Sequence, residues 1–273
     1  MIRPSTILAL AFTLIYATAV SAESVVRMAV TTSFHNSGLS DVLVPLIGED
    51  TGIEVQLIVV GTGQALRLGE AGDVDAVLVH SRAAEDKFVA AGFGTHRREI
   101  MYNDFVIVGP STDPAGVLAA EVIETALSGI STSKSVFVSR GDDSGTHKRE
   151  LSLWSKIGVD VSGSWYRELG SGMGATLNTA SAMNAYTLTD RASWLNFGNK
   201  RELRIVFEGD PELFNQYVFI PVNPDRHPHV NSDGVRLVEE WLVSAKGQTT
   251  IGSYMIDGQT LFVPNAQGND SSD

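Results

Sequence analysis

The chain of 273 residues contains no cysteine, which excludes disulfide bonds and cysteine-ligated metal sites. Basic residues are also few, because 20 Lys and Arg stand against 32 Asp and Glu and leave a formal net charge of −12. This acidic balance argues against nucleic acid and anionic membranes as partners. The hydrophobic fraction of 43% is typical of a globular protein with one large domain or two smaller lobes.

A long apolar run occurs at the N-terminus. Arg3 precedes an apolar stretch over residues 7–20, and the small residues Ser21 and Ala22 follow it. This pattern indicates a secretory signal peptide over residues 1–22, with cleavage near Ala22 and a periplasmic mature protein. An uncleaved membrane anchor is the alternative, which the short run disfavours. At the other end, the polar composition of residues 263–273 predicts a disordered tail.

Strand and helix patterns alternate along the mature chain. Strand patterns over 25–30, 55–59 and 76–79 are separated or followed by helical patterns over 39–47 and 83–91. This alternation predicts an α/β fold, with mostly parallel sheets flanked by helices on both faces. In such folds ligands bind in the loops at the carboxyl ends of the strands.

Two breaks rich in glycine and proline divide the pattern. They predict two crossings between two lobes, near residues 108–112 and 208–222. We expect the first lobe to contain residues 23–108 and 216–262, and the second lobe to contain residues 109–215.

Four loops carry small hydroxyl residues and glycines between a predicted strand and a predicted helix. They are Thr31-Thr32-Ser33 with Ser37, Gly61-Thr62-Gly63, residues 139–147 and residues 170–176. Each loop offers free backbone N–H groups at a helix start, and its glycines let the backbone approach a ligand closely. The set predicts a site for an oxyanion. The alternative is that these residues only cap helices and form turns.

Arg140 is the permanently charged candidate in these loops. Its guanidinium group can bind two oxygen atoms of an oxyanion at once, whereas the alternative is a salt bridge to Asp142 or Asp143. Neutral donors around one arginine would let a protein of negative charge bind an anion, because the affinity comes from local dipoles.

Two other chemistries use residues of the same chain. Ser144 with Asp143 and His147 has the residue types of a hydrolase triad, but close neighbours on one helix start cannot form triad geometry alone. We therefore expect no enzyme, with a secreted serine hydrolase as the distant alternative. His227 and His229 could bind a metal, but no third ligand stands at a supporting spacing. We expect a surface turn there and no metal site.

The chain resembles the TupA-type family of periplasmic tungstate-binding proteins, the capture components of ABC importers. The resemblance covers residues 30–251, and it rests on Thr31-Thr32-Ser33 with Ser37-Gly38-Leu39, residues 60–66, residues 101–110, residues 139–147, residues 172–177 and residues 185–191. One position departs from the family, which usually has a Thr-Thr-Thr-Ser run where this chain begins with Val30. Either one hydroxyl is missing or that position never faces the ligand.

The resemblance implies a two-lobed, type II periplasmic-binding-protein fold that closes on a tetrahedral dianion. It implies tungstate or molybdate as the ligand, no cofactor, and delivery by a monomer to an ABC permease in the inner membrane. Carried onto this sequence, the oxyanion-binding residues are Thr31, Thr32, Ser33, Thr62, Arg140, Ser144, Gly145 and Thr146, with Ser37, Gly63, Gly172 and Gly174 as weaker candidates.

The anion itself is only partly constrained by chemistry. Tungstate, molybdate and sulfate carry no proton at neutral pH and suit a site made of donors, whereas phosphate brings a proton that needs an acceptor. Residues 140–146 also resemble a loop of phosphate-binding proteins, so a phosphate or sulfate receptor is the alternative. A carboxylate of Asp142 or Asp143 that faces the site would favour phosphate, and outward carboxylates would favour tungstate or molybdate. A sensing role in place of transport also stays open.

Overall fold

The structure is a computed structural model that describes residues 24–266. The expected signal peptide over residues 1–22 lies outside the described residues. Every helix within 24–266 is too short or too polar to cross a membrane.

The first part of the described chain contains the strands and helices that residues 25–91 predict. Its elements are β1 (Ser24–Thr31), α1 (Thr32–Asn36), α2 (Leu39–Thr51), β2 (Ile53–Val60), α3 (Thr62–Ala71), β3 (Ala76–Val79), α4 (Arg82–Ala90) and β4 (Arg98–Pro110). Gly52 ends α2 with a positive φ of 70°, which glycine adopts without strain.

The rest of the chain forms the other elements. They are α5 (Ile123–Ser133), β5 (Phe137–Ser139), α6 (Gly145–Lys156), β6 (Tyr166–Glu168), α7 (Met173–Met183), β7 (Thr187–Asp190), α8 (Arg191–Asn196), β8 (Leu203–Phe207), β9 (Phe214–Pro221), α9 (Ser232–Val243), α10 (Ala245–Ser253), β10 (Met255–Ile256), β11 (Gln259–Thr260) and β12 (Val263–Pro264). Short 3-10 turns lie at Val117–Ala119 and Pro211–Leu213.

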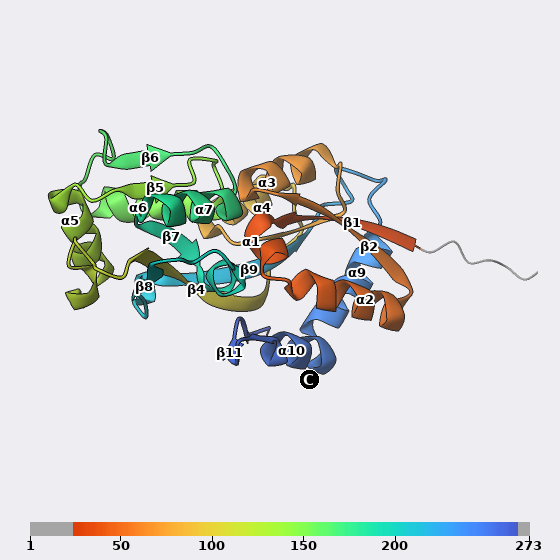
Figure 1. Cartoon of the computed structure of the whole chain (residues 1–273). Coiled ribbons are helices and arrows are strands. Elements are labelled where there is room, and N and C mark those ends of the chain that lie inside the picture. Colours follow the sequence, from red (N-terminus) through yellow and green to blue (C-terminus); the bar gives the residue numbers. More distant parts are fainter. Residues whose placement is uncertain (1–23, 267–273) are drawn as a thin grey trace, which may run out of the picture.

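The first lobe is built around β1, which pairs in parallel with β2 and β3. Successive side chains of a strand point to opposite faces, so Met28 and Val30 join one buried cluster while Ala29 joins another. Helices α2 and α9 pack on this sheet, and α3 contacts β1, β2 and β3. Figure 1 shows β1, β2, α2, α3 and α9 together on the right of the view.

The long strand β4 belongs to two sheets. Up to Asp104 it pairs with β9, and from Phe105 onward it pairs with β7 and β8 of the second lobe. The pairing therefore changes a few residues before the expected crossing at 108–112. The chain returns between β8 and β9, inside the expected segment 208–222 (Figure 1). The lobe limits themselves stay a prediction.

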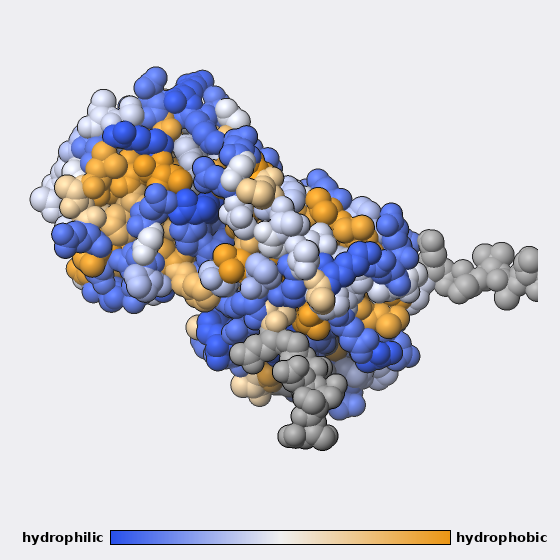
Figure 2. Space-filling view, turned by 90° about the horizontal axis from the view of Figure 1, so that it is seen from below, coloured by the Kyte–Doolittle hydropathy of each residue, from blue (hydrophilic) through white to orange (hydrophobic). Residues whose placement is uncertain are grey.

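The two-lobed α/β class that the sequence predicts is confirmed, but the sheets are mixed and not mostly parallel. The β4 ladders with β7, β8 and β9 are antiparallel, as is the ladder between β3 and β9. The reason is that β4 and β9 carry the chain between the lobes in opposite directions. Figure 2 shows two bodies joined by a narrower middle.

The end of the described chain corrects one prediction. The sequence predicts disorder over residues 263–273, but β12 pairs with Tyr102 and Met101 of β4, and residues 267–273 lie outside the described residues. Asn265 then exchanges side-chain hydrogen bonds with Gln216 at 2.7 and 3.2 Å. The preceding Leu261 and Phe262 are buried, and this apolar anchor holds the polar segment against the sheet.

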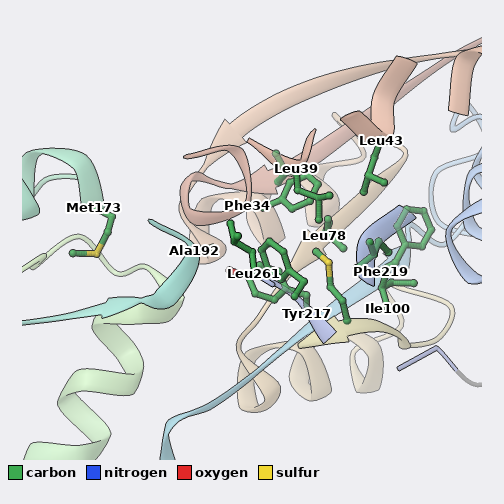
Figure 3. Close-up of a cluster of buried hydrophobic side chains, with 14 of the residues drawn as sticks. Phe34, Leu39, Leu43, Leu78, Ile100, Met173, Ala192, Tyr217, Phe219 and Leu261 are labelled. Atoms are coloured by element: carbon green, nitrogen blue, oxygen red, sulfur yellow. The ribbon is translucent and has the colours of Figure 1, made fainter. Parts of the chain in front are cut away.

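One buried cluster, which contains residues of both lobes, lies next to the loops of interest. Figure 3 shows Phe34, Leu261 and Tyr217 close together, with Leu39 and Leu78 nearby. Because Phe34 belongs to α1, its burial anchors the short helix whose first residues are the predicted hydroxyl run.

Candidate functional site

The hydroxyl run at the end of β1 forms the start of α1. Thr31 caps this helix, and its oxygen accepts a hydrogen bond from the N–H of Phe34 at 3.3 Å. Ser33 is completely buried, and its Oγ lies 3.0 Å from Thr31 Oγ1. Thr32 faces the second lobe, where the Nη2 group of Arg140 donates to its Oγ1 at 3.1 Å. The structure therefore brings all three residues to the boundary between the lobes.

Arg140 follows β5 and is only 2% exposed. Its Nε and Nη2 groups donate to Asp142 Oδ2 at 3.2 and 2.5 Å, so the salt bridge considered above is present. The other carboxylate oxygen of Asp142 accepts from the N–H of Ser144 at 3.2 Å. Burial opposes ionisation of Asp142, but the charge and hydrogen bonds of Arg140 outweigh it and lower the pKa of this carboxyl. Arg140 thus belongs to an ion pair and also reaches across to Thr32.

Helices α3 and α6 begin opposite one another. Thr62 and Thr146, in their first turns, are completely buried, and neither hydroxyl has a hydrogen-bond partner among residues 24–266. A Cβ at Gly145 would lie 2.9 Å from Thr62 Oγ1, so the two helix starts are in contact. Buried hydroxyls are usually paired, so these two hydroxyls at helix N-termini are available as donors to a ligand.

Ser144 precedes Gly145 and caps α6. Its Oγ accepts a hydrogen bond from the N–H of His147 at 3.2 Å. The hydroxyl proton is not used by that bond, so Ser144 can cap the helix and donate to a ligand at the same time.

The four weaker candidates differ in their surroundings. Gly172 caps α7, and a Cβ there would be 4.0 Å from Arg140 Nη2, whereas a Cβ at Gly174 would meet nothing within 4 Å. The Ser37 hydroxyl donates to the carbonyl of Phe34 at 2.6 Å and accepts from the N–H of Leu39 at 3.2 Å. Gly172 thus lies beside Arg140, and the Ser37 hydroxyl is used in the turn between α1 and α2.

The remaining weaker candidate, Gly63, lies under the side chain of Asp143. The Asp143 carboxylate is 61% exposed, lies 3.2 Å from Lys148 Nζ and 3.8 Å from Arg67 Nη1, and covers Gly63 so closely that a Cβ there would overlap with it. A side chain at residue 63 would therefore have to displace the exposed Asp143 carboxylate. Asp143 itself points outward to two basic side chains.

Two residues that the sequence analysis missed stand behind Ser33. His80 Nε2 lies 3.0 Å from Ser33 Oγ, and the Tyr217 hydroxyl donates to the same oxygen at 3.1 Å. His80 follows directly after β3, so its place at the carboxyl end of a parallel strand was a usable signal. Tyr217 carried no such signal, because it lies within β9 and 184 residues from Ser33.

A pocket of about 1020 Å³ opens beside these residues, between the lobes. Its lining includes His80 and Gly145, and both basic and acidic side chains, among them Arg82, Lys148, Arg149, Glu85, Glu99 and Glu212. These three basic residues each pair with a carboxylate, Arg82 with Asp86, Lys148 with Asp143 and Arg149 with Glu212, so the pocket wall is polar and mixed in charge.

The alternative chemistries find little support in the geometry. The Ser144 hydroxyl bonds the backbone of His147, and the imidazole Nδ1 accepts from the N–H of Asp143 at 3.2 Å. No bond between Ser144 Oγ and the imidazole is present within the described residues, so the nucleophile and base are not paired. His227 and His229 bond the carbonyl oxygens of Glu70 and Gly72 at 3.0 and 2.8 Å, as expected of a surface turn.

Comparison with known proteins places this geometry in a family. The model of the PBP superfamily domain matches residues 17–246. The tungstate-binding protein TupA of Peptoclostridium acidaminophilum is 48% identical over 250 residues, which is 90% of this chain and 87% of that protein. The chain belongs to the TupA family.

Solved structures agree with this assignment. The tungstate-binding protein TupA from Desulfovibrio alaskensis G20 is 48% identical with a TM-score of 0.78, over 89% of this chain and all (100%) of that one. The tungstate ABC transporter structure from Geobacter sulfurreducens is also 48% identical, with a TM-score of 0.79 over 86% of this chain and 100% of that one. The TupA resemblance that the sequence predicts is therefore confirmed.

In this member of the TupA family, the departure at Val30 has a simple structural reading. Val30 is completely buried in β1, belongs to the hydrophobic core and pairs with Val59 and Leu78 of the neighbouring strands. The side chain points into the core, so this replacement removes no hydroxyl from the boundary between the lobes.

Proposed function

We propose that this protein is a periplasmic receptor that captures tungstate between its two lobes and delivers it to an ABC permease. The observation that carries the proposal is the pair of buried hydroxyls of Thr62 and Thr146, one from each lobe, without a partner among residues 24–266. A tetrahedral dianion held between the starts of α3 and α6 would accept hydrogen bonds from both.

The donors of the proposed site come from both lobes. We assign Thr31, Thr32 and Thr62 to the first lobe, with Ser33 behind Thr31, and Arg140, Ser144, Gly145 and Thr146 to the second. Each hydrogen bond to a charged oxygen contributes about 1.5–3 kcal/mol, so several of them support tight binding after ordering costs. The lobes would close on the ligand by a hinge motion at β4 and at the segment between β8 and β9.

The two carboxylates near the site favour an anion without protons. Both oxygens of Asp142 already accept hydrogen bonds, from Arg140 and Ser144, and Asp143 points to Lys148 and Arg67. Neither carboxylate is directed at the starts of α3 and α6 as an acceptor for the proton of hydrogen phosphate, so the proposed order places tungstate and molybdate above phosphate. The names of the relatives favour tungstate, and sulfate is the remaining alternative.

The wider setting follows from the family. We infer secretion with cleavage near Ala22, a monomer in the periplasm, a membrane permease as the partner, and neither cofactor nor catalytic turnover. The site residues would bind and release the anion unchanged.

Calorimetric titration of the mature protein tests the proposal, after bound ligand is removed by unfolding and refolding. Tungstate, molybdate, sulfate and phosphate are titrated separately, and we expect one-to-one binding of tungstate without measurable binding of phosphate. Strong phosphate binding with weak tungstate binding would contradict the choice of anion, and no binding of any anion would contradict the receptor.

Two arginine variants give a matched comparison. Arg140→Ala should weaken tungstate binding by about 100-fold, because it removes the buried guanidinium group. Arg67→Ala removes an exposed arginine and should change affinity by about threefold at most. Arg140→Ala also leaves the Asp142 charge uncompensated, so the double variant Arg140→Ala/Asp142→Ala should remain weak if Arg140 itself contributes to binding. Equal affinities of the two single variants would show that Arg140 does not contribute to tungstate binding.

A further inference from the structure

His80 is a buried imidazole at the boundary between the lobes, and the proposed binding of the anion does not by itself explain it. The centroid of the ring lies 4.8 Å from that of Tyr217, with the two planes tilted by 35°, and a Cβ at Gly145 would lie 2.7 Å from its Cε1. Burial, and then the charge of Arg140, lower the pKa of His80 to about 3. The ring is therefore neutral, with a proton on one nitrogen and a lone pair on the other.

The hydroxyl of Ser33 has three neighbours at hydrogen-bond distance. They are Thr31 Oγ1 at 3.0 Å, His80 Nε2 at 3.0 Å and the donating hydroxyl of Tyr217 at 3.1 Å. A serine hydroxyl offers one proton and two acceptor positions. Tyr217 takes one acceptor position, so His80 and Thr31 share the proton and the other acceptor position.

Two arrangements satisfy this count. In the first, His80 donates from Nε2, and Ser33 donates to Thr31. The oxygen of Thr31 then accepts from Ser33 and from the N–H of Phe34, which leaves the Thr31 proton free for a ligand. In the second, Ser33 donates to His80 and Thr31 donates to Ser33. Thr31 then has no proton to offer to a ligand. The choice of protonated nitrogen in His80 therefore sets the direction of all the hydrogen bonds in this series.

We propose that His80 is a positioning residue, protonated at Nε2, which directs hydrogen bonds from Tyr217 and His80 through Ser33 to Thr31 and makes Thr31 a donor to the oxyanion. This inference rests on the proposed function. A chain of bonds with one direction also strengthens its last donor, because each bond polarises the next. The neutral ring adds no charge of its own. Because Thr31 donates in this arrangement, an anion oxygen that carries a proton and faces Thr31 is disfavoured.

Paired amide variants separate the role of Nε2 from that of the ring. The side-chain nitrogen of glutamine reaches the position of Nε2, and that of asparagine reaches the position of Nδ1. We expect His80→Gln to bind tungstate within about threefold of wild type, and His80→Asn to bind at least about tenfold more weakly. Urea unfolding of both variants reports any loss of fold. Equal affinities for two folded variants would overturn the proposal.

A double-mutant cycle tests whether His80 acts through Ser33. In a Ser33→Ala background the hydrogen-bond connection between His80 and Thr31 is already lost, so His80→Asn should cost little further affinity for tungstate. Independent losses that add in the double variant would mean that His80 supports only packing. Titration of the wild-type protein in the same series tests the proposed function separately. If wild type does not bind tungstate, the proposed function fails, but the protonated nitrogen of His80 can still be measured without ligand.

The protonated nitrogen itself is measurable without ligand. Long-range ¹⁵N–¹H spectra of protein labelled in its histidine rings distinguish the two neutral forms, and the signal absent from His80→Gln identifies His80. We expect a protonated Nε2 and an unprotonated Nδ1, both before and after addition of tungstate. A proton on Nδ1 would overturn the proposal even if tungstate binds tightly.

Discussion

Gly145 at the start of α6 lies against the imidazole of His80 from the other lobe, and a Cβ at this glycine would be 2.7 Å from Cε1 and 2.9 Å from Nδ1. The same Cβ would be 2.9 Å from Thr62 Oγ1. The contact therefore exists only because residue 145 has no side chain. Since His80 is buried and its ring packs against that of Tyr217, displacement of the ring would disturb the packing around it.

Gly145→Ala should therefore block full closure of the lobes. We expect tungstate binding to weaken by at least about tenfold, because overpacking of this size costs about 1–3 kcal/mol. Stability of the unliganded protein should not fall, since alanine favours a helix start over glycine and the lobes can open. Calorimetry measures the affinity, and small-angle scattering measures whether tungstate still compacts the protein. Gly174→Ala is the control, because a Cβ there meets nothing within 4 Å; an unchanged affinity of Gly145→Ala would show that closure does not need this contact.

The two unpaired hydroxyls allow binding and stability to be separated. Thr62→Val and Thr146→Val replace a buried hydroxyl that has no partner within residues 24–266 by a methyl group. Each variant should be as stable as wild type or more stable, by up to about 1 kcal/mol, because an unfulfilled polar group is removed. Tungstate affinity should fall about tenfold or more for each, because a donor to the anion is lost.

Thr51→Val provides the opposite control. The Thr51 hydroxyl donates to the carbonyl of Ile47 at 2.6 Å and accepts from the N–H of Ile53 at 3.1 Å, at the end of α2. This variant should lose about 1 kcal/mol of stability and keep its affinity for tungstate. If Thr62→Val and Thr146→Val instead lose stability and keep affinity, their hydroxyls have structural partners and no ligand.

Val30 provides a test of the family pattern. Val30→Thr supplies the hydroxyl that the resemblance to the TupA family leads us to expect, but places it in the buried core of β1. We expect unchanged tungstate affinity and a loss of about 1–2 kcal/mol in unfolding free energy, because the buried hydroxyl must find a partner. Calorimetry and urea unfolding measure the two quantities, and a clear gain in affinity would show that this position does contribute a donor.

Glu150 makes stability depend on pH. Glu150 is 2% exposed, and its carboxyl accepts hydrogen bonds from Ser139 at 2.8 Å and Tyr166 at 2.5 Å. Ser139 directly precedes Arg140 in the sequence. Burial raises the pKa of Glu150 from an ordinary 4.5 to about 7, against the effect of these hydrogen bonds. The folded protein therefore binds this proton more tightly than the unfolded chain does.

The contribution of protonated Glu150 to stability is fully present below about pH 4.5 and is lost as pH rises through about 7. At pH 8 the loss amounts to roughly 3 kcal/mol, from 1.36 kcal/mol per pKa unit. Glu150→Gln keeps an uncharged acceptor, so its stability should exceed that of wild type at pH 8 but not at pH 4.5. Urea unfolding at both pH values measures this difference, and parallel pH profiles of the two proteins would contradict it.

Local chemistry explains what could be predicted from the sequence. Hydroxyl residues and glycines between a strand and a helix supply caps and free N–H groups wherever they occur, so Thr31, Thr62 and Ser144 could be predicted at helix starts before any tertiary contact was known. Period-two and helical patterns likewise predicted the elements of the first lobe.

Tertiary structure decided which of these groups meet, because the contacts join segments far apart in the chain. Arg140 bonds Thr32 across 108 residues, and Tyr217 bonds Ser33 across 184, distances over which periodicity carries no information. The orientation of Asp142 and Asp143 depends on which basic groups the second lobe and α3 place beside them. The sequence by itself thus determined a set of anion donors, and the packing of two lobes decided which donors face each other and how His80 directs them.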